Sequence, residues 1–357
     1  MNILLTCAGR RNYLVGYFQE ALNGLGRVFA ADANAGASAL HEADMGFVVP
    51  PAHDPRYVDA LLDICSANDV GMLIPLNDLE LPVLAKRRED FTAVGTLPVV
   101  SSPDVIDICF DKWGTVTFLE RIGLKAPKTY LTLEDALAAV SAGEIDYPLV
   151  VKPRWGSASI GLEFPADREE LEMACKLTRK RLSRSLLAEA GAADLTHSIL
   201  IQEKLSGWEY GLDVVNDMEG NHECVFVKRK LAMRAGETDR AQTIKNDELE
   251  AIGAMIGRSL RHIGNLDCDV LAGENGLATL EMNPRFGGGY PFSHAAGANL
   301  PAAFIAWANG AEPNPDWLEV TPNVMASKCD RLLIHNDNTD DSVVGNPEAC
   351  PIFSGAR

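Results

Sequence analysis

The sequence predicts an α/β protein with a parallel sheet in its N-terminal part, followed by an α+β part. Over about the first 100 residues, short apolar segments alternate with amphipathic helical patterns, which is typical of a parallel sheet with helices on both faces. Polar residues directly follow several of these apolar segments, at the sheet edge where ligand groups gather. Beyond residue 198, apolar segments follow one another across short turns, which predicts antiparallel strands.

In the N-terminal part, helices are expected between strands that are close in the sequence. The predicted strands are 3–8, 27–34, 47–51 and 70–80, and the predicted helices are 13–22 and 57–68. The polar residues at the ends of these strands are Arg10, Arg11, Asp32, Asn77, Asp78 and Glu80. The first strand–helix turn lacks the glycine pattern of a dinucleotide site, and the sequence contains no P-loop pattern.

The later elements are expected after a junction at 98–104. The predicted elements are a helix at 104–122, a helix capped by Thr132, a strand–turn–strand unit at 147–164, a helix at 167–190, two strands within 198–215, a strand at 224–233, a charged loop at 234–246, a helix at 249–264 and a hairpin at 266–283 with Asn275-Gly276 near its tip. The residues after about 333 are polar and without periodicity, so we expect a loosely held tail.

Composition narrows the class of protein. The chain has 357 residues, 47% of them apolar, and a net charge of −18, which argues against a nucleic-acid surface of clustered Lys and Arg. No apolar run reaches the roughly 18–20 residues of a membrane span, and the N-terminal charges follow the first apolar run instead of preceding it. The eight Cys include no CxxC pair, which favours free thiols. We therefore expect a cytoplasmic protein with neither nucleic acid nor membrane as a partner.

The stretch TLEMNPRFGGG at 279–289 carries the clearest chemical signal. Residues two apart on a strand point the same way, so Glu281 and Asn283 share one face. Asp267 and Asp269 share a face of the partner strand, and the hairpin register decides which one lies beside Glu281. Two carboxylates and an amide oxygen are the hard oxygen donors that suit Mg²⁺.

Cationic and glycine residues complete this pattern. Arg285 continues the same face and can hold a phosphate oxygen or a developing acyl-phosphate charge, while the N–H groups of 287–289 can approach an anionic substrate. Lys152 ends an apolar strand and precedes a Gly/Ser-rich loop that can close over a triphosphate. The pattern suits metal-assisted phosphoryl transfer. The alternatives are a solvated strand edge, an ordinary hairpin at Lys152 and a solvated lysine at Lys112.

Four blocks in order resemble the ATP-grasp superfamily, most closely its carbamoyl-phosphate-synthetase-like branch. They are DK at 111–112, VVKPRWGSASIG at 150–161, IQEKLSGWEYGLDVV at 201–215 and LEMNPRFGGG at 280–289. The last block is the most specific, because EMNPR also occurs in the large subunit of carbamoyl-phosphate synthetase. The resemblance covers roughly residues 1–330.

The resemblance implies a role for each matched residue. Lys112 and Lys152 would hold ATP phosphates, 156–161 would form the flexible phosphate loop, 203–205 would read adenine, and Glu209 would bind ribose. The implied ATP-binding residues are Lys112, Lys152, Gly156, Ser157, Ser159, Glu203, Lys204, Leu205 and Glu209. The implied magnesium ligands are Asp267, Glu281 and Asn283, and the implied phosphate-contacting residues are Arg285 and Arg234.

The resemblance also implies an organisation and cofactors. A Rossmann-like domain at 1–100 would precede an ATP-grasp fold at 101–330, whose two α+β subdomains grip ATP, with a mobile subdomain at about 120–203 and a C-terminal tail at 331–357. ATP and two Mg²⁺ ions would be required, with Mn²⁺ as a substitute. Small-molecule carboxylate and amine substrates are expected, and homodimers are frequent among relatives.

The implied reaction is the activation of a carboxylate by MgATP as an acyl phosphate, followed by attack of an amine or thiol. The synthetase has Gln where Asp267 stands, and the register leaves Asp269 as an alternative ligand. A single module makes the two phosphorylations of carbamoyl phosphate synthesis unlikely. The rival functions are an ATP-grasp enzyme that phosphorylates or carboxylates without forming an amide, and a non-catalytic nucleotide-binding protein.

Candidate substrate contacts lie outside these blocks. Arg10 and Arg11 could clamp an acidic substrate or lie in a solvated turn. Asp78 and Glu80 could hold a substrate amine or cap the next helix, and His294 could face the acceptor or be structural.

Overall fold

The computed structural model describes residues 1–156, 161–184, 194, 196–334 and 343–344. The N-terminal part is built around a six-stranded sheet with the order β15-β3-β2-β1-β4-β5. Its strands are β1 (Asn2–Thr6), β2 (Val28–Asp32), β3 (Met45–Val48), β4 (Val70–Pro75), β5 (Leu97–Pro98) and β15 (Val343–Val344). All pairs are parallel except the antiparallel pair of β15 with β3, which confirms the predicted parallel sheet.

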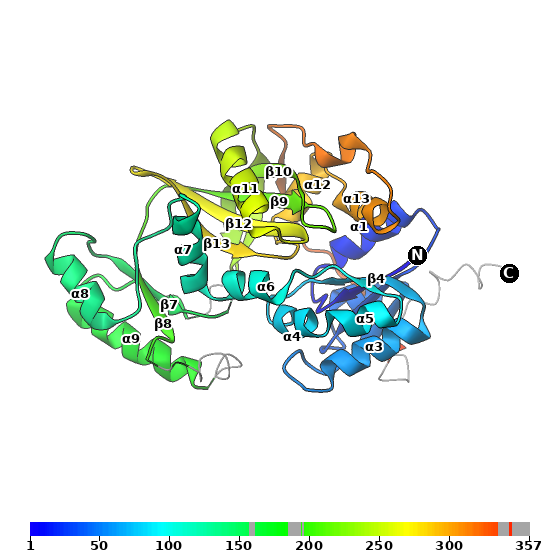
Figure 1. The fold of residues 1–357 in the computed structure, drawn as a ribbon, viewed down its shortest axis with the longest axis horizontal. Helices are drawn as coiled ribbons and strands as arrows, with labels where there is room; N and C mark the ends of the chain where they lie inside the picture. The colour runs from blue at the N-terminus through cyan, green and yellow to red at the C-terminus, as the bar shows by residue number, and fades with distance from the viewer. Residues whose placement is uncertain (157–160, 185–193, 195, 335–342, 345–357) are drawn as a thin grey trace.

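Helices cover both faces of this sheet because the side chains of each strand alternate between two cores. The helices are α1 (Asn12–Leu22), α2 (Ser38–Glu42), α3 (Tyr57–Ala67), α4 (Leu81–Lys86) and α5 (Arg88–Ala93). Ile3 and Leu5 pack with Phe18 of α1, whereas Leu4 packs with Leu61 of α3. Figure 1 accordingly shows α1 on one side of the sheet and α3 on the other.

A small three-stranded sheet with the order β6-β8-β7 forms a lobe at one end of the molecule (Figure 1). Its elements are β6 (Thr129–Tyr130), α8 (Leu133–Ser141), β7 (Leu149–Pro153), α9 (Arg168–Leu182) and β8 (Ile199–Glu203). Helices α6 (Pro103–Phe110) and α7 (Lys112–Arg121) lie between this lobe and the N-terminal part, and the predicted boundary near residue 100 falls between β5 and α6.

The large antiparallel sheet has the order β13-β12-β9-β10-β11-β14. Its strands are β9 (Trp208–Asn216), β10 (His222–Arg234), β11 (Glu237–Thr243), β12 (Gly264–Gly273), β13 (Gly276–Asn283) and β14 (Met325–Ser327). Helix α11 (Asp247–Leu260) packs on it, and α12 (Tyr290–Ala295), α13 (Leu300–Ala308) and the 3-10 helix η1 (Pro315–Leu318) follow. The α/β part followed by an α+β part therefore agrees with the prediction.

One hydrophobic core joins the N-terminal sheet to the large sheet. Phe18 of α1 packs edge-on against Phe286, with ring centroids 6.2 Å apart, and Phe286 contacts Tyr290 and Phe304. These side chains belong to the same buried cluster as Ile3 and Leu5 of β1. The loop that follows β13 is therefore fixed against the first domain.

The structure corrects several predicted elements. The helix expected at 104–122 is broken at Asp111, which adopts an extended conformation and accepts a hydrogen bond from the Trp113 N–H as the N-cap of α7. The charged loop expected at 234–246 contains β11. The helix expected at 249–264 ends at Leu260, followed by Arg261 with φ of 54° instead of a C-terminal glycine.

Two other predictions are changed or fall partly outside the described residues. The second strand expected within 147–164 is reduced to a bridge between Val151 and Glu163. The helix expected at 167–190 is described as α9 up to Leu182. Most of the predicted loose tail lies outside the described residues, although β15 pairs with β3.

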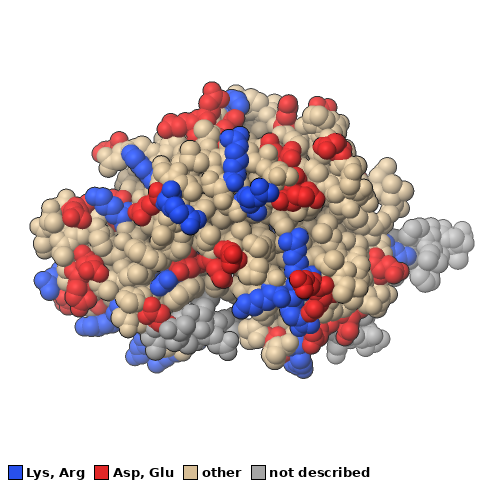
Figure 2. All heavy atoms as spheres, in the orientation of Figure 1, with Lys and Arg blue, Asp and Glu red and all other residues tan. Residues whose placement is uncertain are grey.

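The structure also shows how charged side chains are distributed, whether a helix could cross a membrane, and the state of the cysteines. On the face in Figure 2, basic side chains lie singly or in small groups among acidic ones. Within the part of the chain that the structure describes, no helix is both long enough and apolar enough to cross a membrane. The seven cysteines in that part are all free thiols, as the sequence predicted.

Candidate functional site

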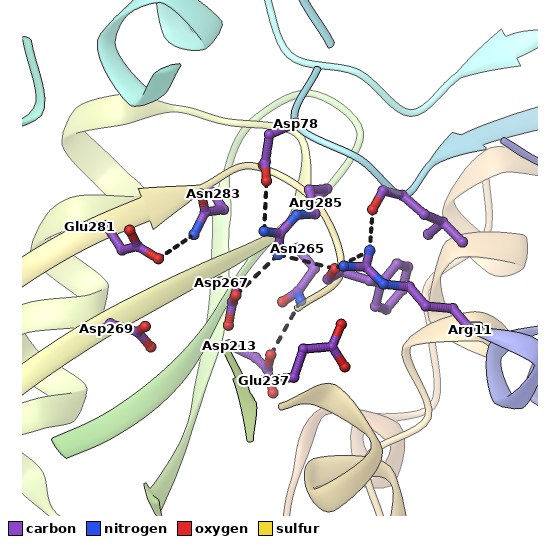
Figure 3. Close-up of polar contacts among 12 residues, drawn as sticks. Arg11, Asp78, Asp213, Glu237, Asn265, Asp267, Asp269, Glu281, Asn283 and Arg285 are labelled. Carbon is purple, nitrogen blue, oxygen red and sulfur yellow. Dashed lines mark hydrogen bonds and ion pairs between the residues drawn. The ribbon is translucent and has the colours of Figure 1, made fainter. Parts of the chain in front are cut away.

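The β12–β13 hairpin brings the predicted metal ligands onto one face. Its register pairs Asp267 with Asn283 and Asp269 with Glu281, and it shifts between Asp269 and Val270. Figure 3 shows these four side chains on the same side of the hairpin. Asn283 Nδ2 donates a 3.3 Å hydrogen bond to Glu281 Oε1.

Arg285 lies at the end of this face and is held by two carboxylates from different parts of the chain. Its guanidinium contacts Asp78 Oδ2 at 2.8 Å and Asp267 Oδ2 at 3.0 Å (Figure 3). All three side chains are largely buried, with exposures of 9% for Arg285, 7% for Asp78 and 16% for Asp267. The two carboxylates raise the pKa of Arg285, outweighing the opposite effect of burial, so this guanidinium stays charged.

The two predicted phosphate-binding lysines approach the same face from other segments. Lys112 begins α7, and its Nζ donates to the Gly156 carbonyl in the predicted phosphate loop. Burial lowers the pKa of Lys112, while the charges of Glu281 and Asp78 oppose that shift. Burial and the neighbouring Lys112 lower the pKa of Lys152 to about 8, and Glu281 opposes this. The Lys112 N–H also donates a 3.0 Å hydrogen bond to the carbonyl oxygen of Arg154, directly after the strand that carries Lys152, so the two lysines lie on adjoining segments.

The lowered pKa of Lys152 predicts a pH dependence for nucleotide use. If Lys152 binds a phosphate, kcat/KM for ATP should be highest below pH 8 and fall above it, approaching tenfold per pH unit, because the free enzyme loses this positive charge. Steady-state rates between pH 6.5 and 9.5 measure this profile. Lys152→Arg should remove the decline, since arginine stays protonated. A decline that persists in that variant would show that another group is responsible.

Gly287 and Gly289 are required by close packing against charged side chains. A Cβ on Gly287 would lie 2.1 Å from the Asp267 carboxyl carbon, and a Cβ on Gly289 would lie 2.7 Å from Cε of Lys228. A Cβ on Gly288 would approach Glu237 at 3.4 Å, which is ordinary contact. The loop thus lies directly on the acidic face of the large sheet.

Gly287→Ala should lower activity more than stability. The new methyl group must displace the Asp267 carboxylate, which moves a predicted metal ligand and removes a partner of Arg285. A misplacement of this size can cost about 100-fold in kcat, and weakening the buried pair of Asp267 with Arg285 should also lower the melting temperature. Gly288→Ala is the matched control and should cause a smaller loss. Equal rates for the two variants would contradict the steric argument.

Lys230 connects the predicted ribose ligand to the acidic face. Its ammonium contacts Glu209 Oε1 and Asp269 Oδ1, each at 2.6 Å, and its side chain is only 8% exposed. Burial raises the pKa of Asp269 to about 7, although Lys230 opposes this shift. Both carboxylates are paired with a cation, Asp269 with Lys230 and Asp267 with Arg285, so both remain candidates for the third metal ligand.

The predicted adenine-binding segment lies at the end of β8. Glu203 Oε1 accepts a 2.8 Å hydrogen bond from the Lys128 N–H, and Lys204 places its ammonium 5.2 Å from the ring centre of Phe164. Leu205 follows as a half-buried residue between β8 and β9. The predictions for Ser157 and Ser159 lie outside the described residues.

Three segments of the chain meet at a narrow pocket beside Arg285 and the acidic face. Asp78 from the N-terminal part, Gly156 from the predicted phosphate loop and Asn283 from β13 all line it. A wider groove of about 980 Å³ lies elsewhere, between α11 and the segment 318–322, and none of the predicted site residues lines it. Predicted site residues therefore line the narrow pocket and not the wider groove.

Glu80 is not a substrate contact, which corrects that prediction. Its side chain is fully buried, and Oε1 accepts hydrogen bonds from the N–H groups of Leu76 (3.0 Å) and Asn77 (3.1 Å) while Oε2 accepts from Tyr57. The carboxylate closes the turn after β4 instead of capping the next helix, because it makes no cap hydrogen bond to α4.

Arg234, His294 and Arg10 were also predicted to contact phosphate or substrate, and the structure places each in different surroundings. Arg234 is 45% exposed at the end of β10 and pairs with Asp239 and Asp330, so it does not contact the Arg285 cluster. His294 stacks on Tyr17 with ring centroids 3.6 Å apart, and burial lowers its pKa. Arg10 is exposed in the turn after β1.

Arg11 and Asp78, predicted as substrate contacts, also connect the two parts of the protein. Arg11 donates to the carbonyl oxygens of Leu76 and Phe286, which follow β4 and β13 respectively. Asp78 pairs with Arg285 across the same junction. Figure 3 shows Arg11 and Asp78 approaching this position from the N-terminal part.

Sequence reasoning missed Lys230 and a second buried cluster. Lys228 contacts Asp213 Oδ2 at 2.5 Å, and Ser293 and Asn265 also bond to Asp213. The alternation of VKRK does signal that Lys228 and Lys230 share a face of β10, but only the strand order reveals their partners on β9 and β12.

The residues present fit a hydrated Mg²⁺ ion. Asp267, Glu281 and Asn283 supply oxygen donors from adjacent, register-matched strands, and Asn283 lines the same narrow pocket as Gly156 of the predicted phosphate loop. Among the described residues, no group of three or more His, Cys, Asp or Glu is placed to hold a metal ion by itself. An open site that also accepts phosphate oxygens agrees with this arrangement.

Comparisons with known proteins agree with the fold. A family model described as the PylC-like N-terminal domain matches residues 3–100, and a model described as ATP-grasp in the biosynthetic pathway with Ter operon matches 196–330. Carbamoyl phosphate synthase large chains from Pasteurella multocida and Ralstonia nicotianae are 27% and 29% identical over 199 and 209 residues, covering 51% and 52% of this chain. The matches span only 17% and 18% of those relatives.

Solved structures show the same architecture at low sequence identity. Biotin carboxylase from Campylobacter jejuni superposes with a TM-score of 0.70 and 15% identity, covering 89% of this chain and 73% of that one. The L-amino acid ligase from Bacillus licheniformis superposes with a TM-score of 0.65 and 20% identity, covering 88% and 75%.

The fold and the arrangement of the site together define an ATP-grasp protein. Residues 196–330 match an ATP-grasp family model, residues 3–100 match a PylC-like N-terminal model, and about half of the chain is similar to carbamoyl phosphate synthase large chains.

Proposed function

We propose that this protein is an ATP- and Mg²⁺-dependent ligase that joins the carboxylate of a small amino-acid-like molecule to an amine or a thiol. The observation that supports this most strongly is the meeting of separate segments at one pocket. Glu281 and Arg285 lie along one face of the hairpin, and Gly156 of the predicted phosphate loop, to which Lys112 donates, lines the same pocket as Asn283. Two cations beside an acidic face are the groups needed to bind a nucleoside triphosphate with its metal ion and to move phosphate charge.

The proposed reaction has two steps. A carboxylate oxygen attacks the γ-phosphorus of ATP, which releases ADP and gives an acyl phosphate. The nucleophile then attacks the acyl carbon, forms the new bond and releases phosphate. Lys112 and Lys152 would hold phosphate oxygens, and Arg285 would stabilise the negative charge that develops between phosphate and carboxylate.

The metal and the nucleotide would be held by residues on the same face. Asp267, Glu281 and Asn283 would bind Mg²⁺, which supplies neutralisation of phosphate charge when bound. Mn²⁺ would fit the same oxygen donors, and a second ion would share them. Glu209 would bind the ribose, and residues 203–205 with Gly156 would surround the base and the phosphates.

Trapping with hydroxylamine tests this function. The enzyme is incubated with MgATP, hydroxylamine and one carboxylic acid at a time, and ADP and hydroxamate are measured. The expected result is ADP and hydroxamate in equal amounts for a subset of acids, and an amide when an amine replaces hydroxylamine. Glu281→Gln should abolish both products, whereas Glu274→Gln, exposed at the tip of the same hairpin, should not.

The outcomes separate this proposal from its rivals. ADP formed with a stable phosphorylated product, or only with bicarbonate, would identify an enzyme that phosphorylates or carboxylates without forming an amide. The absence of ADP with every acid would favour a non-catalytic nucleotide-binding protein.

The assembly and location are also proposals. The biotin carboxylase domain of 2-oxoglutarate carboxylase from Hydrogenobacter thermophilus is a dimer, and it superposes on this chain with a TM-score of 0.70. We expect a homodimer, and light scattering would then give twice the 38.6 kDa mass of the chain. Cell fractionation would test the expected cytoplasmic location.

A further inference from the structure

A buried hydroxyl near the site lacks a hydrogen-bond partner. The Tyr13 hydroxyl, on α1, makes no hydrogen bond to any residue that the structure describes. Burial raises the pKa of Tyr13 to about 12, and the charges of Arg11 and Glu237 also act on it, which places these groups nearby. Leaving a buried hydroxyl unpaired is unfavourable by about 1–3 kcal/mol. A bound ligand group is therefore expected beside it.

A carboxylate with spare hydrogen-bonding capacity lies on the other side of this position. Glu237, the first residue of β11, accepts a 3.1 Å hydrogen bond from Lys328 at Oε2, and no other described residue donates to it. Figure 3 shows Glu237 between Asp267 and Arg11. Burial would raise its pKa, but Lys328 and Arg11 outweigh this, so the carboxylate is ionised. Oxygen Oε1 is thus available to a cationic ligand group.

The same lysine connects these two residues into one group. The Lys328 ammonium lies 5.9 Å from the ring centre of Tyr13 as well as on Glu237. Gly288 lies against Glu237, so the group borders the loop that carries Arg285. Tyr13 also senses the charge of Arg285, whose Nε is buried without a hydrogen-bond partner in the described part of the chain.

The unused groups therefore form a complementary pair. Glu237 can accept from an ammonium group, whereas the Tyr13 hydroxyl and Arg285 Nε can donate to a carboxylate. A ligand that carries both groups on one carbon would satisfy all of them. A simple carboxylic acid would offer no cation to Glu237, which is 48% exposed, and a dicarboxylic acid without an amine would bring a second negative charge toward it.

We propose that Tyr13 and Glu237 form the binding site for an α-amino acid that serves as the carboxylate-donating substrate. Glu237 accepts a hydrogen bond from the α-ammonium group, and the Tyr13 hydroxyl donates to the carboxylate on the side of Arg285. This inference rests on the ligase function proposed above and specifies its substrate class.

The test uses the full-length enzyme with MgATP, hydroxylamine and each of the proteinogenic L-amino acids. For the best amino acid, Glu237→Gln should raise its KM by about 10- to 100-fold and Tyr13→Phe by about 3- to 10-fold, while the KM for ATP stays near wild type. The N-acetyl and des-amino forms of that amino acid should be poor substrates. Tyr17→Phe on the same helix and Glu223→Gln on β10 are the matched controls and should keep the wild-type KM.

Each outcome decides either the inference or the ligase function. Equal use of the des-amino acid, or an unchanged KM in both variants, would overturn the amino-acid site and leave the ligase function standing. If no carboxylic acid gives ADP or hydroxamate, the ligase function fails. Calorimetry of the same amino acids with the enzyme and MgADP then decides the inference. Binding that Glu237→Gln abolishes would support the site, and the absence of binding would overturn it.

Discussion

Replacing Arg285 with lysine should reduce kcat by about 100- to 1000-fold, the usual cost of losing one contact that stabilises transition-state charge. The guanidinium holds Asp78 and Asp267 at once through its planar fork, and it also donates to the Phe286 carbonyl. A lysine ammonium cannot reproduce this geometry, because it is a single point charge on a flexible stem. ADP release at saturating ATP and carboxylate measures the loss.

Arg234→Lys is the informative comparison for this variant. Arg234 is the other arginine predicted to contact phosphate, but it is exposed and paired with Asp239 and Asp330. We expect a rate close to wild type for this variant. A loss as large as that of Arg285→Lys would show that Arg234 moves into the site during turnover, and a wild-type rate for Arg285→Lys would remove the charge argument.

Asp78→Asn should destabilise the fold by about 3 kcal/mol. Removing one member of a buried ion pair typically costs about 3–5 kcal/mol, because the remaining charge lacks compensation. Asp267 still faces Arg285 in the variant, so we expect the lower end of that range. The midpoint of urea unfolding measures the change.

The control for Asp78→Asn is an ion pair at the surface. Asp330 pairs with Arg234 and is 80% exposed, so Asp330→Asn should leave the unfolding midpoint almost unchanged. If Asp78→Asn were as stable as wild type, the contact between Asp78 and Arg285 would contribute nothing to the junction between the two parts. The activity of the Asp78→Asn variant should also fall, since Arg285 would lose one of the two carboxylates that orient it.

Local sequence pattern predicted the elements that carry the chemistry. The β12–β13 hairpin could be predicted because two apolar segments flank Asn275-Gly276, and alternation then placed Glu281 and Asn283 on one face. The register of Asp267 and Asp269 could not be decided from the sequence, because the shift after Asp269 has no local signal.

Strand β11 and the break between α6 and α7 could not be predicted from the sequence, because their side chains resemble those of other elements. In β11 the inward positions are Thr238, Ala241 and Thr243, which are small or polar, so the strand resembles a charged loop. The break between α6 and α7 was hidden because apolar periodicity continues on both sides of Asp111. In these cases tertiary packing, more than local propensity, determines the structure.

Long-range pairs explain the remaining errors in the site. Asp78 and Arg285 are 207 residues apart, and nothing near either residue indicates that they meet. Glu80 lies in a loop that looks suitable for a ligand, yet its carboxylate already accepts hydrogen bonds from neighbouring N–H groups. Tyr13 and Glu237, which we propose as a ligand site, are likewise far apart in sequence and are linked through Lys328, which contacts both.

The contacts of Arg11 with the carbonyl oxygens after β4 and β13 have a consequence for chimeric proteins. An N-terminal domain borrowed from a distant homologue would have to supply both this arginine and the counter-charge for Arg285. Without them, the transplanted protein would lack the contacts that hold Arg285 and the loop after β13 in place. We therefore expect functional chimeras only when both parts come from the same protein.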